Sequence, residues 1–185
     1  MNYFIADLHI GHENALKFDK RPFKTIKEHD NFIMEEWNKK ITDEDDVYIL
    51  GDISWLGIQE TVEYFRKLKG KKHLIKGNHD AKYLKNHELQ RLFIEIVDYK
   101  EIYINNRIGL VLSHYPSPCF KNHYYDWYHF YGHVHNSPEW DFIEKVKNDM
   151  IKTLKFPCNM YNVGAMMSYI NYIPQSFNEI TSFTD

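Results

Sequence analysis

The chain has 185 residues, of which 43% are hydrophobic and 26% are charged. These proportions are those of a globular protein and exclude a disordered or collagen-like chain. With 23 basic and 26 acidic residues, the formal net charge is −3, which gives no overall attraction for a nucleic-acid backbone. We expect residues 1–185 to form a single domain, large enough to bury its own core.

Membrane insertion and secretion are not indicated. No run of 18 apolar residues predicts a membrane helix, and the first residues show no basic and apolar leader, so we expect a cytoplasmic protein. The two cysteines, Cys119 and Cys158, are interpreted as reduced thiols. The 11 histidines are more informative, because several lie near Asp, Asn and Gly residues. Such clusters suggest a metal site.

The first half of the chain alternates between strand and helix patterns. Short apolar runs predict strands over 3–6, 47–50 and 73–75, and helical spacing predicts helices over 25–39 and 58–68. Thr25 and Glu28 have the spacing of a capping box, and Gly70 is placed to cap the second helix. This order predicts a parallel α/β sheet, and ligands bind such sheets at the carboxyl ends of the strands.

The second half changes in character. Alternation predicts a strand over 94–104, a turn at Asn105–Asn106 and a returning strand over 108–112, which adds an antiparallel hairpin. Further expected elements are an aromatic-rich loop over 117–128, a strand ending in 129–135, a helix beginning at Ser137–Pro138, and closing strands over 161–163 and 169–173.

Five short motifs carry the residues suited to chemistry: Asp7-x-His9, Gly51-Asp52, Gly77-Asn78-His79-Asp80, Ser113-His114 and Gly132-His133-x-His135. Alternate residues of a strand face the same side, so each pair spaced by two is expected to point at one place. Two carboxylates, one amide oxygen and four imidazoles are too many for one metal, but they suit two metals that share a carboxylate. This donor mixture favours Mn, Fe, Zn or Ni over Ca or Mg.

These five motifs, in this order, resemble the pattern of the calcineurin-like metallophosphoesterases. The match spans residues 7 to 135, and the stretches Gly11-His12, Arg21-Pro22-Phe23 and Ser113-His114-Tyr115-Pro116 resemble a small stand-alone branch from bacteria and phages. The resemblance implies an α/β fold, a four-layer sandwich of two mixed β-sheets flanked by helices, with the metals at the sheet ends.

The resemblance also implies roles for individual residues. The first metal would be held by Asp7, His9, Asp52 and His135, and the second by Asp52, Asn78, His114 and His133, with Asp52 bridging. His79 would assist the leaving group and Asp80 would orient His79. The implied cofactors are two divalent transition metal ions, with Mn²⁺ favoured and Fe, Zn or Ni as alternatives.

The implied activity is hydrolysis of phosphomonoesters or phosphodiesters through attack by a hydroxide that bridges the two metals. The expected partner is a small phosphate ester or nucleotide. A nucleic acid is possible but not indicated, no membrane partner is expected, and the oligomeric state stays open. One alternative is a catalytically silent scaffold of the same fold that binds a partner, and another is a hydrolase with one metal. Retention of all seven ligands and His79 favours the enzyme.

Other residues have competing interpretations. Arg21 could clamp a phosphate oxygen, although a surface arginine ahead of a helix is favoured, and Asn14 and His12 could lie beside the first metal. The aromatic stretch over 120–131 could stack on a nucleobase, although packing is the commoner reason for such residues. His29, His73 and His87 are interpreted as ordinary surface histidines.

Overall fold

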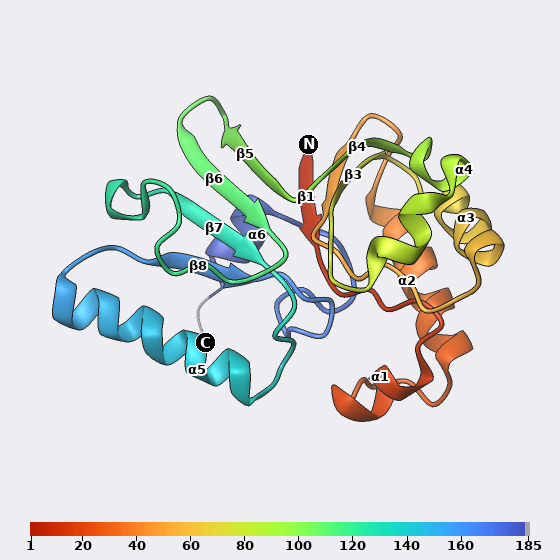
Figure 1. The fold of residues 1–185 in the computed structure, drawn as a ribbon, viewed down its shortest axis with the longest axis horizontal. Helices are drawn as coiled ribbons and strands as arrows, with labels where there is room; N and C mark the ends of the chain where they lie inside the picture. Colours follow the sequence, from red (N-terminus) through yellow and green to blue (C-terminus); the bar gives the residue numbers. More distant parts are fainter. Residues whose placement is uncertain (184–185) are drawn as a thin grey trace.

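The computed structural model describes residues 1–183 and contains two mixed β-sheets (Figure 1). The first has the strand order β4-β3-β2-β1-β9. Its strands are β1 (Asn2–Ile5), β2 (Asp46–Ile49), β3 (Lys71–Ile75), β4 (Phe93–Val97) and β9 (Gln175–Ser176). β1 to β4 are parallel and β9 is antiparallel to β1. The predicted alternation of strand and helix is therefore confirmed.

The second sheet has the order β5-β6-β7-β8. Its strands are β5 (Tyr99–Ile104), β6 (Ile108–Ser113), β7 (Tyr128–Tyr131) and β8 (Asn159–Asn162). β5 and β6 form the predicted antiparallel hairpin, whereas β6, β7 and β8 are parallel. Asn105 and Asn106 turn the hairpin with φ of 51° and 57°, a left-handed conformation that asparagine tolerates better than most residues.

Helices α2 (Ile26–Lys40), α3 (Ile58–Lys67) and α4 (His87–Gln90) lie beside the first sheet, and α5 (Pro138–Asp149) runs along the second (Figure 1). Thr25 begins α2 as predicted, because its hydroxyl accepts the Glu28 N–H at 3.1 Å. The shorter segments are α1 (Glu13–Phe18), α6 (Phe177–Thr181), the 3₁₀ helices η1 (Asp80–Lys85) and η2 (His123–Tyr125), and the π-helical turn η3 (Met150–Leu154).

One core connects the two sheets. Phe4 of β1 contacts Phe130 of β7 edge-on, with ring centroids 5.0 Å apart. Phe120 and Tyr131 pack in a second cluster behind the second sheet. Packing therefore accounts for the buried members of the aromatic stretch, while Tyr125 is exposed. The described residues include no helix with the length and apolar character that would span a bilayer.

Two strand predictions were wrong. The stretch 94–104 is not one strand: it breaks at Asp98, and its two parts, β4 and β5, belong to different sheets. The stretch 169–173 forms turns, because Asn171 and Tyr172 are both left-handed, with φ of 48° and 63°. Two left-handed residues in succession end an extended conformation, and the closing strand is β9 instead.

Two of the three histidines interpreted as surface residues are buried. His29 is fully buried, and its Nδ1 lies 2.8 Å from the Asp30 carboxylate. His73 lies between Asp46 and Glu95, at 2.8 and 2.7 Å from their carboxylates. Only His87 is exposed, as predicted.

Candidate metal centre

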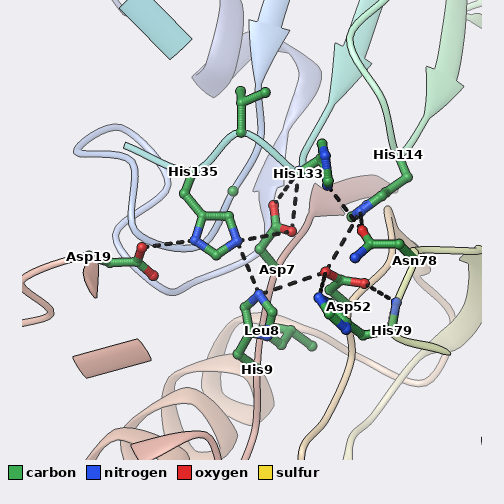
Figure 2. A network of polar contacts seen from close by, with 12 residues as sticks. Asp7, Leu8, His9, Asp19, Asp52, Asn78, His79, His114, His133 and His135 are labelled. Carbon is green, nitrogen blue, oxygen red and sulfur yellow. Dashed lines mark hydrogen bonds and ion pairs between the residues drawn. The ribbon is translucent and has the colours of Figure 1, made fainter. Parts of the chain in front are cut away.

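The seven residues predicted as metal ligands come together where the two sheets meet (Figure 2). Asp7, Asp52 and Asn78 follow β1, β2 and β3, whereas His114 and His133 follow β6 and β7. The carboxyl ends of parallel strands share an edge, which gathers side chains that lie far apart in sequence. Each sheet therefore contributes part of the centre.

The backbone at the centre is left-handed rather than extended. Asp7, His9, Asp52, His133 and His135 have φ of 53°, 50°, 54°, 71° and 49°. The expected alternation along a strand is therefore not what brings these side chains together. They lie just beyond the strand ends, in a conformation that costs on the order of 1–2 kcal/mol per residue. Backbone strain of this kind is concentrated at functional sites.

The first group of side chains consists of Asp7, His9 and His135, whose ligand atoms lie within 4.8 Å of one another. Nε2 of His135 is 3.1 Å from Nε2 of His9 and 3.6 Å from Oδ1 of Asp7. The other ring nitrogen of His135 lies 2.8 Å from the Asp19 carboxylate. A carboxylate behind a histidine fixes the ring orientation and makes the histidine a stronger ligand.

The second group consists of Asp7, Asp52 and His114, again within 4.8 Å. Oδ2 of Asp52 lies 3.7 Å from Nε2 of His114 and 3.9 Å from Nε2 of His9, so this carboxylate lies between the two imidazoles. Nδ1 of His114 is 2.7 Å from the Leu50 carbonyl. It must be the protonated nitrogen, because a carbonyl can only accept, so Nε2 is left with a lone pair facing the centre.

Asn78 and His133 complete this side of the centre. Oδ1 of Asn78 lies 2.9 Å from Nε2 of His114 and 3.0 Å from Nδ1 of His133. The backbone N–H of His133 donates to both carboxylate oxygens of Asp7, at 3.2 and 3.0 Å. Three ligand types, carboxylate, amide oxygen and imidazole, therefore point into one small volume.

The electrostatics of the centre fit a bound cation. The side chains of Asp7 and Asp52 are 0% and 3% exposed, and among residues 1–183 their charge partners are imidazoles rather than Lys or Arg. Burial raises the pKa of Asp7 and lowers the pKa of His9. Buried carboxylates without a fixed cation are costly. A divalent ion would neutralise them, and the mixed oxygen and imidazole donors suit a transition metal.

Two motif glycines are required for this geometry. A Cβ at Gly77 would lie 2.2 Å from Oδ1 of Asp52, and one at Gly132 would lie 2.5 Å from Oδ2 of Asp7. Both distances are far below a van der Waals contact. The absence of a side chain at these positions lets each carboxylate approach the neighbouring backbone.

His79 lies at the edge of the centre. Its Nε2 is 3.9 Å from Oδ2 of Asp52, its side chain is 44% exposed, and its backbone N–H donates to Oδ1 of Asp52 at 3.0 Å. It is therefore the most accessible nitrogen base beside the two carboxylates and can reach a molecule bound from solvent.

Asp80 does not orient His79, and this prediction was wrong. The Asp80 carboxylate is buried and accepts the backbone N–H groups of Asp52, Ile53 and Gly77 at 3.0, 3.0 and 2.7 Å. Both of its oxygens are engaged in these bonds. Asp80 therefore ties the loop after β2 to the loop after β3, and its effect on the centre is to place Asp52.

Neither interpretation of Arg21 was correct. Its side chain is 0% exposed, so it is not a surface arginine and presents no atom to a phosphate. The guanidinium donates to the carbonyls of Leu8 and Asp7 at 3.0 and 3.1 Å and pairs with Asp19 at 2.8 Å. Arg21 thus holds the loop that carries Asp7 and His9. Asp19 was not predicted as a site residue, because it belongs to no motif and its partner His135 is 116 residues away in the sequence.

Of the two residues expected beside the first metal, His12 lies near a candidate ligand and Asn14 does not. Asn14 is exposed on α1, and no contact to the centre places it as a substrate ligand. His12 stacks flat on Trp55, with ring centroids 4.1 Å apart and an interplanar angle of 6°. It lies beside His9, at 5.4 Å between ring centroids.

The fold and the clustered Asp and His side chains define an α/β sandwich protein with residues suited to bind metal ions. Residues 3–164 match the sequence model of the calcineurin-like phosphoesterases, and the chain belongs to this family. Family members generally bind divalent metals, which agrees with the donor set found here.

The relatives are small proteins without an assigned activity. The chain is 27% identical to an uncharacterised protein of Methanocaldococcus jannaschii, over 99% of this chain and 90% of that protein. It is 33% identical to the gene 66 protein of Mycobacterium phage D29, over 62% of this chain and 63% of that protein. A crystal structure of a protein of unknown function from Aquifex aeolicus has a TM-score of 0.71 and 28% identity, with 98% of each chain covered.

Proposed function

We propose that this protein is a metal-dependent phosphoesterase that hydrolyses phosphomonoesters or phosphodiesters. The observation that carries the proposal is the position of the Asp52 carboxylate between the two groups of candidate ligands. Its Oδ2 lies 3.9 Å from Nε2 of His9 and 3.7 Å from Nε2 of His114, and the half-exposed imidazole of His79 lies 3.9 Å from the same oxygen. A closed structural metal site needs neither two adjacent groups nor an accessible base. The proposed cofactors are two divalent transition metal ions, with Mn²⁺ as the favoured ion.

The residues divide between the two ions as the family resemblance implies. Asp7, His9, Asp52 and His135 would hold the first ion, and Asp52, Asn78, His114 and His133 the second. When bound, the pair would withdraw negative charge from a phosphate ester and make water a stronger nucleophile near neutral pH. Asp19 and the Leu50 carbonyl hold His135 and His114 in the orientation that this binding needs.

His79 supplies the proton that the leaving group needs. A water oxygen forms a bond to phosphorus while the bond from phosphorus to the leaving oxygen breaks. His79 gives a proton to that leaving oxygen, and the proton lost by water passes to solvent or to the His79 ring. General acid catalysis of this kind contributes roughly 10²- to 10⁴-fold.

Space for the rest of a substrate adjoins the centre. A cavity of about 420 Å³ is lined in part by Lys76, Lys85 and Tyr115. The Tyr115 ring is 51% exposed and lies 4.6 Å from the His133 ring, centroid to centroid. Lys76 pairs at 2.7 Å with Asp98, which also lines this cavity. The support for a small phosphate ester or a nucleotide as substrate therefore rests on Lys85 and the exposed ring of Tyr115.

The test is hydrolysis of bis-p-nitrophenyl phosphate and p-nitrophenyl phosphate by protein stripped of metal and then supplied with Mn²⁺, Fe²⁺, Zn²⁺ or Ni²⁺. We expect metal-dependent turnover that is lost in Asp52→Asn. Asp46→Asn is the matched control, because Asp46 lies in β2 but pairs with His73, away from the centre. Folded, metal-loaded protein that hydrolyses neither ester would favour the alternative, a catalytically silent binding scaffold.

A further inference from the structure

The position of His79 needs an explanation that Asp80 does not provide. Within residues 1–183, the imidazole of His79 has no hydrogen-bond partner, and its nearest charged atom, Oδ2 of Asp52, lies 3.9 Å away. The side chain is 44% exposed. An imidazole that gives a proton to a bound substrate must be held in one orientation, because a displacement of about 1 Å can cost 100-fold in rate.

Trp55 is the nearest aromatic side chain to this imidazole among residues 1–183. The rings of Trp55 and His79 lie 4.4 Å apart at 61°, an edge-to-face arrangement. The same tryptophan lies 5.3 Å from the ring of His9. Trp55 thus lies beside both a candidate metal ligand and the candidate proton donor.

Trp55 is itself held firmly. One face stacks on His12 at 4.1 Å and 6°, and Nζ of Lys82 lies 5.6 Å from its ring centroid. Its backbone N–H donates to the Ile10 carbonyl at 2.6 Å. The three rings of His12, Trp55 and His79 therefore form a column (called here the ring column) that joins the segment after β1 to the loops after β2 and β3.

We propose that Trp55 is the positioning residue for His79 and that His12 supports Trp55 by stacking on its ring. An edge-to-face contact fixes where a ring lies without occupying either of its nitrogens. A carboxylate partner would instead take one nitrogen as a hydrogen-bond donor. The ring column therefore leaves His79 free to carry a proton to a substrate while limiting its rotation. The catalytic part of this inference rests on the proposed phosphoesterase activity; the structural part does not.

The structural part is tested by the mobility of the imidazole. Protein labelled with ¹³C at histidine Cε1 is studied by NMR relaxation as wild type, Trp55→Phe, Trp55→Leu and Phe142→Leu, with the His79 signal assigned from His79→Ala. Phe142 is a control because it is an exposed aromatic residue on α5. We expect the His79 ring to lose order in Trp55→Leu and to keep it in Trp55→Phe and Phe142→Leu. Unchanged order in Trp55→Leu overturns the proposal.

The catalytic part is tested by a double-mutant cycle of Trp55→Leu and His79→Ala, with metal content measured for each protein. On phosphodiesters with a poor leaving group, Trp55→Leu is expected to lower kcat about 5- to 10-fold with little change in KM, while Trp55→Phe recovers most of the loss. In the His79→Ala background, Trp55→Leu should cost nothing further, because Trp55 acts through His79.

The outcomes separate the two proposals. Additive losses, or loss of metal in Trp55→Leu, would assign Trp55 a role through His9 and contradict the positioning role. Wild-type protein that hydrolyses no ester would reject the proposed function, and the NMR measurement would then decide alone whether Trp55 positions His79.

Discussion

Asp52 is held from three directions. Its Oδ1 accepts the His79 N–H, its backbone N–H donates to Asp80, and the bare Cα of Gly77 lies against its carboxylate. None of these contacts is made by a metal ligand side chain. Asp52 is thus placed by backbone groups and by the Asp80 side chain in the loops after β2 and β3.

Gly77→Ala is expected to abolish metal binding. The added Cβ would lie 2.2 Å from Oδ1 of Asp52, so the carboxylate or the loop must move. Metal content measured after dialysis should fall to background, and turnover should be lost with it. Gly57→Ala is the control, since its Cβ would meet only the flexible Glu60 side chain at 2.9 Å. Full metal content in Gly77→Ala would contradict the close approach described here.

Asp80→Asn is expected to destabilise the protein rather than to act on His79 alone. The amide would turn a donor group toward backbone N–H groups that need an acceptor. The loss of such bonds to a charged acceptor costs about 2–3 kcal/mol, measurable by urea unfolding of the metal-free protein. Asp98→Asn, at an 81% exposed side chain, should change stability little. Equal stability of Asp80→Asn and Asp98→Asn would contradict this structural role and favour the original prediction that Asp80 orients His79.

Individual site residues could be predicted from the sequence where residue type and spacing together form a metal-binding motif. The pairs Asp7-x-His9 and His133-x-His135 combine metal-binding types at short range, and the structure brings them together. Arg21 and Asp19 could not be placed, because a buried ion pair leaves no local pattern. The conformation was also beyond prediction: an alternating strand and a left-handed loop can present the same two residues to one point.

β6 and β7 are neighbouring parallel strands joined by a long connection over residues 114–127. His129 of β7 links that connection to the sheet through hydrogen bonds. Its Nε2 accepts the Ser117 N–H at 3.1 Å, and its Nδ1 donates to the Val111 carbonyl at 3.2 Å. The ring is fully buried, and burial lowers its pKa to about 4. His129 is therefore neutral in the folded protein at neutral pH.

This burial predicts loss of stability in mild acid. The unfolded chain protonates His129 near pH 6.5 but the folded protein only near pH 4. Above about pH 6.5, His129 does not lower the free energy of unfolding. As the pH drops toward 4, protonation of His129 in the unfolded chain lowers the free energy of unfolding by up to about 3 kcal/mol. His129→Gln keeps an acceptor and a donor but does not titrate. Between pH 6.5 and 4, we expect the free energy of unfolding to decline less in metal-free His129→Gln than in metal-free wild type. Parallel pH dependences for the two proteins would contradict a role for His129 in acid sensitivity.

Helices and strands with a clear hydrophobic periodicity were predicted well. The boundary at which the chain leaves one sheet and enters the other was not predicted. α2 and α3 have apolar stripes, and the first three strands end in polar motifs, so local pattern suffices. β4 and β5 read as one alternating stretch because each is half-buried. Only the three-dimensional partners, β3 for one and β6 for the other, separate them.

Across the whole molecule, the centre is assembled from both sheets. Asp7, Asp52 and Asn78 belong to the first, and His114 and His133 to the second (Figures 1 and 2). A bound ion would therefore connect the two halves of the sandwich. Ions that bind only the folded protein stabilise it by mass action.

Metal removal is expected to lower the thermal stability of the whole chain. At a free metal concentration 100 times the Kd, binding contributes about 2.7 kcal/mol, which corresponds to a Tm change of roughly 5–10 °C in a protein of this size. Differential scanning calorimetry with Mn²⁺ and with a chelator measures it. The shift should vanish in Asp52→Asn, and a chelator-insensitive wild-type Tm would contradict the linkage.

The left-handed backbone at Asp7, His9, Asp52, His133 and His135 has a consequence for protein engineering. Glycine adopts this conformation without the steric cost that other residues carry. A library selected only for heat resistance in the presence of chelator should therefore enrich glycine at these five positions. Such clones would keep only Asn78 and His114 of the seven candidate ligands, so selection for stability alone would drive this scaffold toward a stable but inactive descendant.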